Sequence, residues 1–209
     1  MRIIMIKNVI FDLGNVLLRF RPHTLLKETF KNEDICEALM KAVFKAPEWI
    51  ELDKGTMTDA EATDAFVRHN PVYENEIREI MSKWTLALTP IEAHVRVLED
   101  LKKDGYKLYI LSNFHKTAFE EQQDLHPFFE CFDGGVVSAY VHQLKPDHDI
   151  YRSLMAKYDL VPENSLFLDD MLENIEAAKE LGIHGIQVTE NIDLPIELKA
   201  YTGGNKCKF

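Results

Sequence analysis

The sequence predicts an α/β fold, in which a parallel sheet carries helices on both faces and an all-helical cap domain is inserted after the first strand. Three observations support this prediction. An apolar run rich in Val and Ile, Val9–Phe11, is typical of a strand buried on both faces. Residues 19–88 have helical spacing throughout, and strands then alternate with helices from Thr89 onwards.

Composition narrows the class of protein. The 209 residues are 46% hydrophobic and 28% charged, which suits one α/β domain with an insertion or two small domains. The net charge of -11, with no basic block, argues against a nucleic-acid partner. No apolar run could span a membrane, and the N-terminus lacks the features of a signal peptide. Because Cys36, Cys131 and Cys207 are widely spaced, they fit reduced thiols, and we expect a cytoplasmic protein without a membrane partner.

The first strand ends in a carboxylate. Asp12 interrupts the apolar run, and the turn residues Gly14 and Asn15 follow it. A buried carboxylate is costly unless a partner or a metal compensates it. Asp12 is therefore a candidate site residue, although an Asp here could also simply open a turn or cap a helix.

The next stretch predicts the cap. No strand-like alternation occurs in residues 19–88, and the stretch is too long for a simple crossover between parallel strands. We predict a helical cap domain over 19–88 and a core domain formed by 1–18 and 89–209. Thr58 and Glu61 have the spacing of a capping box. The expected helices are Thr24–Phe30, Asp34–Phe44, Pro47–Leu52, Thr58–His69 and Glu74–Leu86.

Regular alternation defines the rest of the core domain as a Rossmann-like sheet. Strands are expected at Tyr106–Leu111, Val136–Ser138, Ser165–Leu168 and His184–Val188. Helices are expected at Ile91–Lys103, His115–Leu125, Asp147–Tyr158, Leu172–Leu181 and Leu194–Tyr201, and the tail Thr202–Phe209 is expected to fray.

Polar side chains follow three of these strands. They are Asp12, Ser112–Asn113 and Asp169–Asp170, and Lys145 lies in a loop between two elements. Each has an ordinary structural explanation, because Ser and Asp often cap helices and a single Lys usually lies in solvent. The carboxyl ends of parallel strands, however, meet at one edge of the sheet. We therefore expect these side chains to converge.

The chemistry of such a cluster is specific. Carboxylates held together raise one another's pKa unless a cation neutralises them. Oxygen ligands suit Mg²⁺, and phosphoryl transfer depends on positioning and charge neutralisation. A carboxylate can itself be the nucleophile and form an aspartyl-phosphate. The cluster thus predicts a magnesium site beside a nucleophilic carboxylate.

Four short motifs carry a resemblance that covers nearly the whole chain. They are Asp12-Leu13-Gly14-Asn15, Leu111-Ser112-Asn113, Leu144-Lys145-Pro146 and Phe167-Leu168-Asp169-Asp170-Met171-Leu172-Glu173-Asn174. In this order and spacing they resemble the motifs of the haloacid dehalogenase (HAD) superfamily, in which a helical cap follows the first motif. The Asp-Leu-Gly-Asn pattern is similar to that of a branch that includes sugar-1-phosphate phosphatases.

The resemblance implies a Mg²⁺-dependent phosphatase that hydrolyses a small phosphorylated metabolite, sugar phosphates included, through an aspartyl-phosphate. Asp12 would be the nucleophile, and it would bind Mg²⁺ together with the backbone carbonyl of Gly14 and the carboxylate of Asp170. Ser112 would hydrogen-bond the phosphoryl oxygens. Lys145 would neutralise the phosphoryl group and pair with the nucleophile or with the neighbouring Asp169.

Further residues receive supporting roles from the same resemblance. Asn174 would orient the metal shell, and Asn15 and Asn113 would line the pocket. The cap would exclude water and select the substrate. We expect Trp49 and Trp84 in the core of the cap. Arg19 and Arg21 could reach a second anionic group, but arginines at such a hinge usually form surface ion pairs.

The departure from the family pattern is Gly14. Family phosphatases commonly have a second Asp there, which protonates the leaving oxygen and then activates water. Because general acid–base help is typically worth ~10²–10⁴-fold, its absence predicts slower turnover. His115 is a candidate substitute, against the commoner case of a His that faces solvent.

Several alternatives stay open at the level of sequence. A 2-haloacid dehalogenase would use the same aspartate without a metal, and the pair Asp169–Asp170 counts against it. A phosphomutase would need the missing acid. A receiver domain has its acidic pair first in the chain, unlike this one. A catalytically weakened protein that only binds a phosphometabolite would also fit Gly14, and no pattern indicates an oligomeric state.

Overall fold

A parallel sheet forms the centre of the molecule, as the sequence predicted. The structure, a computed structural model, describes residues 5–202. Its main sheet has five strands in the order β5-β4-β1-β6-β7, and all neighbours are parallel. The strands are β1 (Asn8–Phe11), β4 (Lys107–Ser112), β5 (Gly134–Val137), β6 (Ser165–Asp169) and β7 (His184–Gln187).

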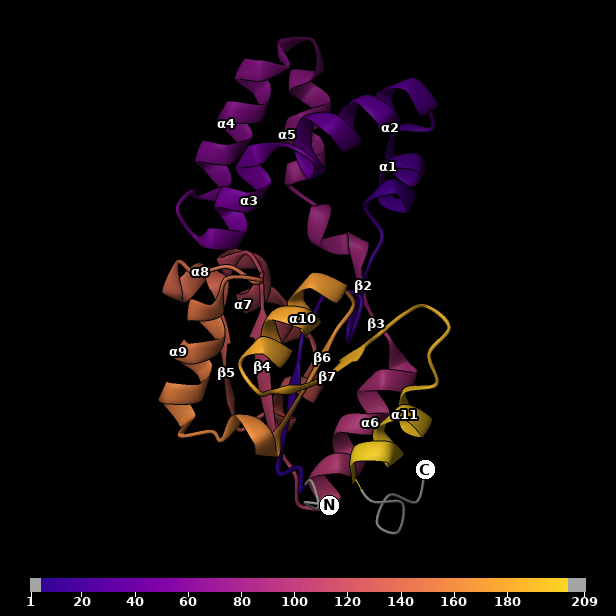
Figure 1. The fold of residues 1–209 in the computed structure, drawn as a ribbon. Coiled ribbons are helices and arrows are strands. Elements are labelled where there is room, and N and C mark those ends of the chain that lie inside the picture. The colour runs from indigo at the N-terminus through magenta and orange to yellow at the C-terminus, as the bar shows by residue number, and fades with distance from the viewer. Residues whose placement is uncertain (1–4, 203–209) are drawn as a thin grey trace.

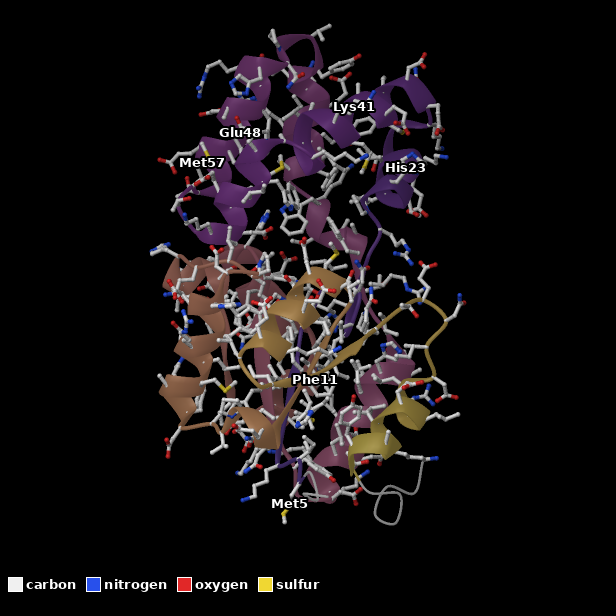
Figure 2. All side chains as sticks on the ribbon, in the orientation of Figure 1. Met5, Phe11, His23, Lys41, Glu48 and Met57 are labelled. Carbon is white, nitrogen blue, oxygen red and sulfur yellow. The ribbon has the colours of Figure 1, made fainter. Side chains whose placement is uncertain are left out.

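Helices cover both faces of this sheet (Figure 1). Along β1, Val9 and Phe11 join the apolar cluster that contains α6 and α11, whereas Ile10 joins the cluster that contains α9 and α10. This alternation follows from the two-residue period of a strand. Phe11, labelled in Figure 2, is fully buried. The helices of the core are α6 (Glu92–Lys103), α7 (Lys116–Leu125), α8 (Ser138–Val141), α9 (His148–Tyr158), α10 (Leu172–Glu180) and α11 (Leu194–Thr202).

The inserted helices form a second layer above the carboxyl ends of the strands (Figure 1). They share an apolar cluster of their own, which includes Leu39, Phe66 and Ile77. The Thr58–Glu61 capping box is present and starts α4. The helices are α1 (Pro22–Phe30), α2 (Glu33–Leu39), a π-helical turn at Met40–Phe44, α3 (Pro47–Lys54), α4 (Asp59–His69) and α5 (Glu74–Met81).

Two short strands correct the prediction that residues 19–88 contain helices only. β2 (Leu18–Phe20) and β3 (Leu88–Pro90) pair antiparallel where the chain enters and leaves the cap. Each segment is too short to show alternation, because its partner is far away in the sequence. The pair straddles the boundaries that we predicted at 18/19 and 88/89, and this division into domains remains a prediction.

Several element ends also differ from those predicted. The predicted helix 34–44 changes to a π-helical turn after Leu39, and the predicted helix 74–86 ends at Met81 before a 3-10 helix at Trp84–Ala87. Ser138 starts α8 instead of ending β5. Other 3-10 helices lie at Pro71–Tyr73, Pro127–Cys131 and Pro162–Asn164. Thr202 closes α11, and the remaining residues predicted to fray, with Cys207, lie outside the described part.

No helix in residues 5–202 combines the length and the apolar character that crossing a membrane would require.

Candidate functional site

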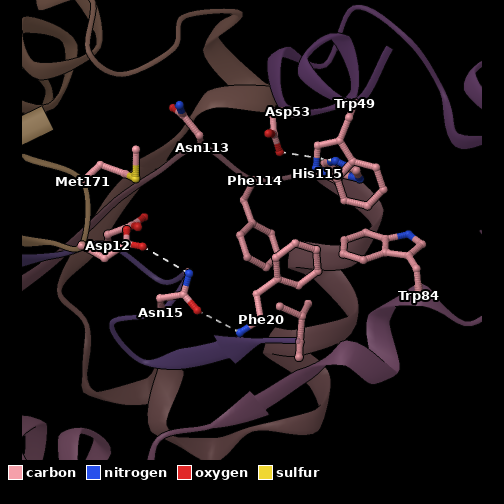
Figure 3. Close-up of a pocket in the computed structure, with 13 residues that line it drawn as sticks. Asp12, Asn15, Phe20, Trp49, Asp53, Trp84, Asn113, Phe114, His115 and Met171 are labelled. Carbon is pink, nitrogen blue, oxygen red and sulfur yellow. Dashed lines mark hydrogen bonds and ion pairs between the residues drawn. The ribbon is translucent and has the colours of Figure 1, made fainter. Parts of the chain in front are cut away.

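A cavity of about 340 Å³ lies where the cap meets the carboxyl ends of the central strands (Figure 3). The core, the cap, and the hinge between them, which consists of the strands β2 and β3, all contribute residues to the lining. Its lining residues are Asp12, Gly14, Asn15, Phe20, Trp49, Asp53, Trp84, Leu88, Asn113, Phe114, His115, Asp170 and Met171.

Asp12 lies at the end of the central strand β1. Its backbone N–H donates to the carbonyl of Leu168, 2.9 Å away, and thereby extends the pairing of β1 with β6. The carboxylate is buried, with 7% of the residue exposed. Burial raises the pKa of Asp12, and the positive charge of Lys145 opposes this rise. The backbone therefore fixes a costly carboxylate at the cavity, as the sequence predicted.

Lys145 supplies a positive charge that compensates the buried carboxylate of Asp12. Its Nζ lies 2.9 Å from Asp12 Oδ1 and 2.6 Å from Asp169 Oδ2, and it donates to the carbonyl of Leu111 at 3.0 Å. Burial alone would lower the pKa of Lys145, but the two carboxylates raise it. Lys145 is therefore a buried cation. The sequence left open which of the two carboxylates it would meet, and it contacts both.

Asp169 is fully buried and has a full set of donors. Besides Lys145, it accepts from the backbone N–H of Met171 at 2.8 Å and from Asn174 Nδ2 at 3.0 and 3.1 Å. Asn174 thus holds Asp169 directly, whereas the resemblance implied that it would orient a metal shell. These bonds fix Asp169, which in turn fixes the position of Lys145.

Asp12, Lys145, Asp169 and Asp170 form the polar cluster that we call the floor of the cavity. Gly14 and Asn15 lie next to this cluster. Asn15 donates from Nδ2 to Asp170 Oδ2 at 3.1 Å and accepts at Oδ1 from the N–H of Phe20 at 3.2 Å. Asn15 adopts a positive φ of 52°, which Asn tolerates better than most residues. Gly14 lines the cavity beside Asp12. Asn15 therefore links β2, where the chain enters the cap, to Asp170, a candidate metal ligand.

The carboxylates of the floor fit a divalent cation. Asp12, Asp169 and Asp170 offer oxygen atoms that all lie within 4.8 Å of one another. Burial raises the pKa of Asp170 above its ordinary value, and the charge of Asp169 adds to the rise. One lysine does not balance three carboxylates, so a hard cation with oxygen ligands would satisfy the excess charge.

The last residue of β4, Ser112, and the loop that follows it supply the remaining predicted residues. Ser112 is fully buried and its hydroxyl lowers the pKa of Asp12, but otherwise its Oγ has no hydrogen-bond partner in residues 5–202. Asn113 lines the cavity. Its amide is nonetheless committed to the backbone of Lys145, since Oδ1 accepts from N–H at 2.9 Å and Nδ2 donates to the carbonyl at 3.0 Å. Asn113 therefore positions the lysine loop.

An aromatic wall faces the polar floor, and we define it by the apolar residues Phe20, Trp49, Trp84, Leu88 and Phe114. The ring centroids of Trp49 and Trp84 are 4.9 Å apart, and each ring also contacts Phe20 at about 6 Å. Trp49 packs against the apolar cluster of the cap, as predicted, whereas Trp84 belongs to the apolar cluster of the core domain, which corrects the prediction for that residue. Both rings also line the cavity (Figure 3).

Two polar residues interrupt the aromatic wall. His115 is only 2% exposed, so the usual expectation of a solvent-facing His is wrong here. Its ring contacts Trp49 and Trp84 at 4.4 and 4.7 Å, and Nε2 lies 3.3 Å from Asp53 Oδ1. Asp53 was not predicted. It comes four residues after Trp49 on α3, and this spacing, which places both on one helix face, was the available signal.

The two arginines of the hinge lie outside this cavity. Arg21 pairs with Glu190 at 2.7 Å, and both side chains are exposed, as expected of a surface ion pair. Arg19 and Arg21 line a neighbouring depression, which shares Asn15 and Asp170 with the cavity.

A Rossmann-like core with a helical cap, and a buried Asp–Lys–Asp cluster at the strand ends, define a class of capped hydrolase folds. The family model of haloacid dehalogenase-like hydrolases matches residues 9–188, and the chain belongs to this family. It is 24% identical to the sesquiterpene phosphatase astK of Aspergillus oryzae over 197 residues, which are 94% of this chain and 97% of the relative. It is also 26% identical to bifunctional epoxide hydrolase 2 of Rattus norvegicus, but that match covers 80% of this chain and 30% of the relative.

Solved structures agree in fold. A HAD family enzyme from Bacteroides thetaiotaomicron, in complex with magnesium and inorganic phosphate, superposes with a TM-score of 0.71 at 22% identity, over 90% of this chain and 97% of the other. An L-2-haloacid dehalogenase from Xanthobacter autotrophicus, with chloropropionic acid covalently bound, gives 0.67 at 18% identity, over 95% and 84%. At these identities the likeness concerns the fold.

Proposed function

We propose that this hydrolase is a Mg²⁺-dependent phosphatase that cleaves the phosphate monoester of a small metabolite through an aspartyl-phosphate on Asp12. One observation carries the proposal. Asp12, Asp169 and Asp170 bring their oxygens within 4.8 Å of one another beside a buried lysine, which suits a cation and a doubly charged phosphoryl group.

Each residue of the floor has a role in this reaction. Asp12 Oδ attacks phosphorus while the bond to the leaving oxygen breaks. Lys145, held by Asp169, stays charged next to Asp12 and neutralises the incoming phosphoryl oxygens. The Ser112 hydroxyl is free to donate to one of these oxygens, since it lacks a firm partner in the described chain. Positioning and charge neutralisation account for most of the catalysis in such transfers.

The metal would be held by the carboxylates of Asp12 and Asp170 together with the carbonyl of Gly14. When bound, Mg²⁺ supplies positive charge for the phosphoryl oxygens and for the crowded carboxylates. Asn15 keeps Asp170 in place for this purpose. A HAD family enzyme of similar fold binds magnesium and inorganic phosphate together, which supports the choice of Mg²⁺ as the metal.

The aromatic wall indicates which class of substrate the cavity favours. A sugar needs several hydrogen-bonding groups, but the amides of Asn15 and Asn113 are already committed to other protein groups. The remaining lining above the floor is apolar except for Asp53 and His115. We propose that the leaving group is apolar or aromatic, consistent with the name of the sesquiterpene phosphatase relative. A sugar phosphate is the second candidate.

Phosphate release tests the proposal. The protein is assayed with Mg²⁺ and with EDTA against terpenyl, aryl and short alkyl phosphates and against sugar phosphates. Metal-dependent release, fastest for apolar esters, is the expected result. Preference for sugar phosphates would contradict the substrate assignment, and no release from any ester would contradict the phosphatase.

A dehalogenase is the other candidate, because the structural neighbour with covalently bound chloropropionic acid shares the fold. The carboxylates near Asp12 oppose it, since they would repel a carboxylate substrate in the absence of a cation. Halide release from 2-chloropropionate in the presence of EDTA would favour the dehalogenase over the phosphatase.

A further inference from the structure

The cap contributes one carboxylate, that of Asp53, to the lining of the cavity. Asp53 lies at the end of α3 (Pro47–Lys54) and faces the cavity from the side of the cap, whereas Asp12 belongs to the floor (Figure 3). Its side chain is 23% exposed. Among the ion pairs of residues 5–202, Asp53 has no lysine or arginine partner and meets only His115. An unpaired carboxylate in such a place needs another explanation.

The backbone holds Asp53 firmly against the core. The Ser138 hydroxyl donates to the carbonyl of Asp53 and accepts from the N–H of Phe114 at 2.9 Å. Gly55 follows with a φ of 71°, and a Cβ there would collide with the carbonyl of Ala139. Only glycine allows this close approach of α3 to α8. Ser138 therefore joins the segment of Asp53 to the segment of His115.

His115 lies against the Asp53 side chain. The ring is packed against both tryptophans of the aromatic wall, and burial lowers the pKa of His115 to about 3. The imidazole is therefore neutral at neutral pH. His115 Nε2 lies 3.3 Å from Asp53 Oδ1 without forming a hydrogen bond within residues 5–202, but a neutral imidazole can accept from a carboxylic acid or donate to a carboxylate, depending on its tautomer, once the two groups align. It can thus stay in contact with either form of Asp53.

Asp53 also has the proton affinity that acid–base work requires. Burial raises the pKa of Asp53 from its ordinary 3.8 to about 7, and the negative charge of Asp12 contributes. A carboxyl group that titrates near the working pH can give up and take back a proton in one cycle. The floor cannot do this at Gly14, which has no side chain.

We propose that Asp53 is the acid–base residue of the phosphatase, supplied by the cap, and that His115 positions it. The inference rests on the proposed function. In the first step Asp12 Oδ bonds to phosphorus, the leaving oxygen takes the electron pair of the broken P–O bond, and the Asp53 carboxyl gives that oxygen its proton. In the second step the Asp53 carboxylate takes a proton from water, whose oxygen attacks phosphorus and releases inorganic phosphate and the Asp12 carboxylate.

Leaving-group dependence tests this role. Asp53→Asn is compared with wild type and with Asp64→Asn, a matched change of an exposed carboxylate on the cap. Single-turnover release of the leaving group is measured for 2-phenylethyl phosphate, which needs a proton, and for p-nitrophenyl phosphate, which does not. We expect Asp53→Asn to slow the alkyl ester ~10²–10⁴-fold and the nitrophenyl ester much less. The slow second step should leave phosphoenzyme on Asp12, which mass spectrometry detects.

The outcomes separate the two proposals. Equal slowing of both esters without accumulated phosphoenzyme would show a merely structural role for Asp53, and rates like those of Asp64→Asn would show none. Either result overturns this inference while the phosphatase stands. A wild-type protein that releases no phosphate from any ester overturns both. His115→Gln, which can still hydrogen-bond, should retain more of the alkyl-ester rate than His115→Phe.

Discussion

Different interactions hold the floor and the aromatic wall of the cavity together: the floor depends on buried charges, and the wall depends on the packing of rings. The floor is a closed electrostatic network, in which Lys145 lies within 3 Å of Asp12 and Asp169 and every partner comes from the core. The aromatic wall is assembled from hinge, cap and core segments that pack ring against ring, and only the contact of Asp53 with His115 interrupts its apolar lining. Under the proposed function, the floor would carry out the phosphoryl transfer and the wall would select the substrate.

Because of this difference, we expect residues of the floor to tolerate mutation less well than residues of the wall. A floor residue has no substitute, because a charge removed from a buried network leaves its partner uncompensated. A wall residue contributes contact area, which neighbouring rings partly replace. The following predictions run from the floor to the wall, in order of decreasing effect.

Asp12→Asn should have the largest effect. An amide is a poor nucleophile, so turnover should fall more than about 10³-fold, the scale seen when a nucleophile is removed. Phosphate release is measured for wild type and variant at saturating Mg²⁺, with circular dichroism as the check that the fold persists. Turnover of a folded variant at the wild-type level would sink the assignment of Asp12.

Removal of the metal comes next. If Mg²⁺ supplies several kcal/mol to phosphoryl transfer, EDTA should reduce turnover by about 10²–10³-fold and added Mg²⁺ should restore it. Asp170→Asn should raise the Mg²⁺ concentration needed for half-maximal activity, whereas Asp64→Asn, a change of an exposed carboxylate on the cap, should not. Full activity in EDTA would contradict a metal at the floor and favour the dehalogenase.

A change in the aromatic wall should alter selectivity more than chemistry. Phe20→Leu removes ring contacts with Phe44, Trp49 and Trp84 and leaves the rings that pack on His115 in place. We expect kcat/KM to fall about 10-fold for an apolar ester and to change little for methyl phosphate, on the scale of lost apolar contact. Leu86→Ala, an exposed apolar residue of the same region, is the control. Equal losses for both esters would contradict a role of the wall in selectivity.

The smallest effect concerns stability and pH. Because folding raises the pKa of Asp53 from 3.8 to about 7, the folded protein holds a proton that the unfolded chain releases in this interval. The unfolded state then binds fewer protons, so the free energy of unfolding falls as the pH rises from 4 to 7. Asp53→Asn removes this decrease in the free energy of unfolding, because the amide does not titrate. The Tm of this variant should match wild type at pH 4 and exceed it by about 5 °C at pH 8. A difference in Tm that does not depend on pH would contradict the raised pKa of the partly buried Asp53.

The sequence predicted the floor better than the wall for a physical reason. Val9–Phe11 is apolar on both faces of its strand, and pairing in register with β4 and β6 then brings Asp12 beside the other strand ends. The convergence of Asp12 with Asp169 and Asp170 thus follows from local pattern and the rule of parallel sheets. The short strands β2 and β3 escaped prediction because each depends on a partner outside its own segment.

The wall depends on contacts that no local pattern encodes. Trp84 leaves the cap bundle only because α5 ends at Met81, and His115 is buried only because the rings of Trp49 and Trp84 meet it there. Asp53 reaches the cavity through the seating of α3 on α8 at Gly55. A glycine after a helix predicts the end of the helix, but it does not reveal what the last turn will face.

The most direct measurement is mass spectrometry of the protein after rapid acid quench during turnover of p-nitrophenyl phosphate with Mg²⁺. The account predicts a phosphoryl group on the peptide that contains Asp12, absent in Asp12→Asn and more abundant in Asp53→Asn. Turnover without any phosphoryl group on that peptide, together with persisting phosphate release in Asp12→Asn, would contradict the claim that Asp12 is the nucleophile.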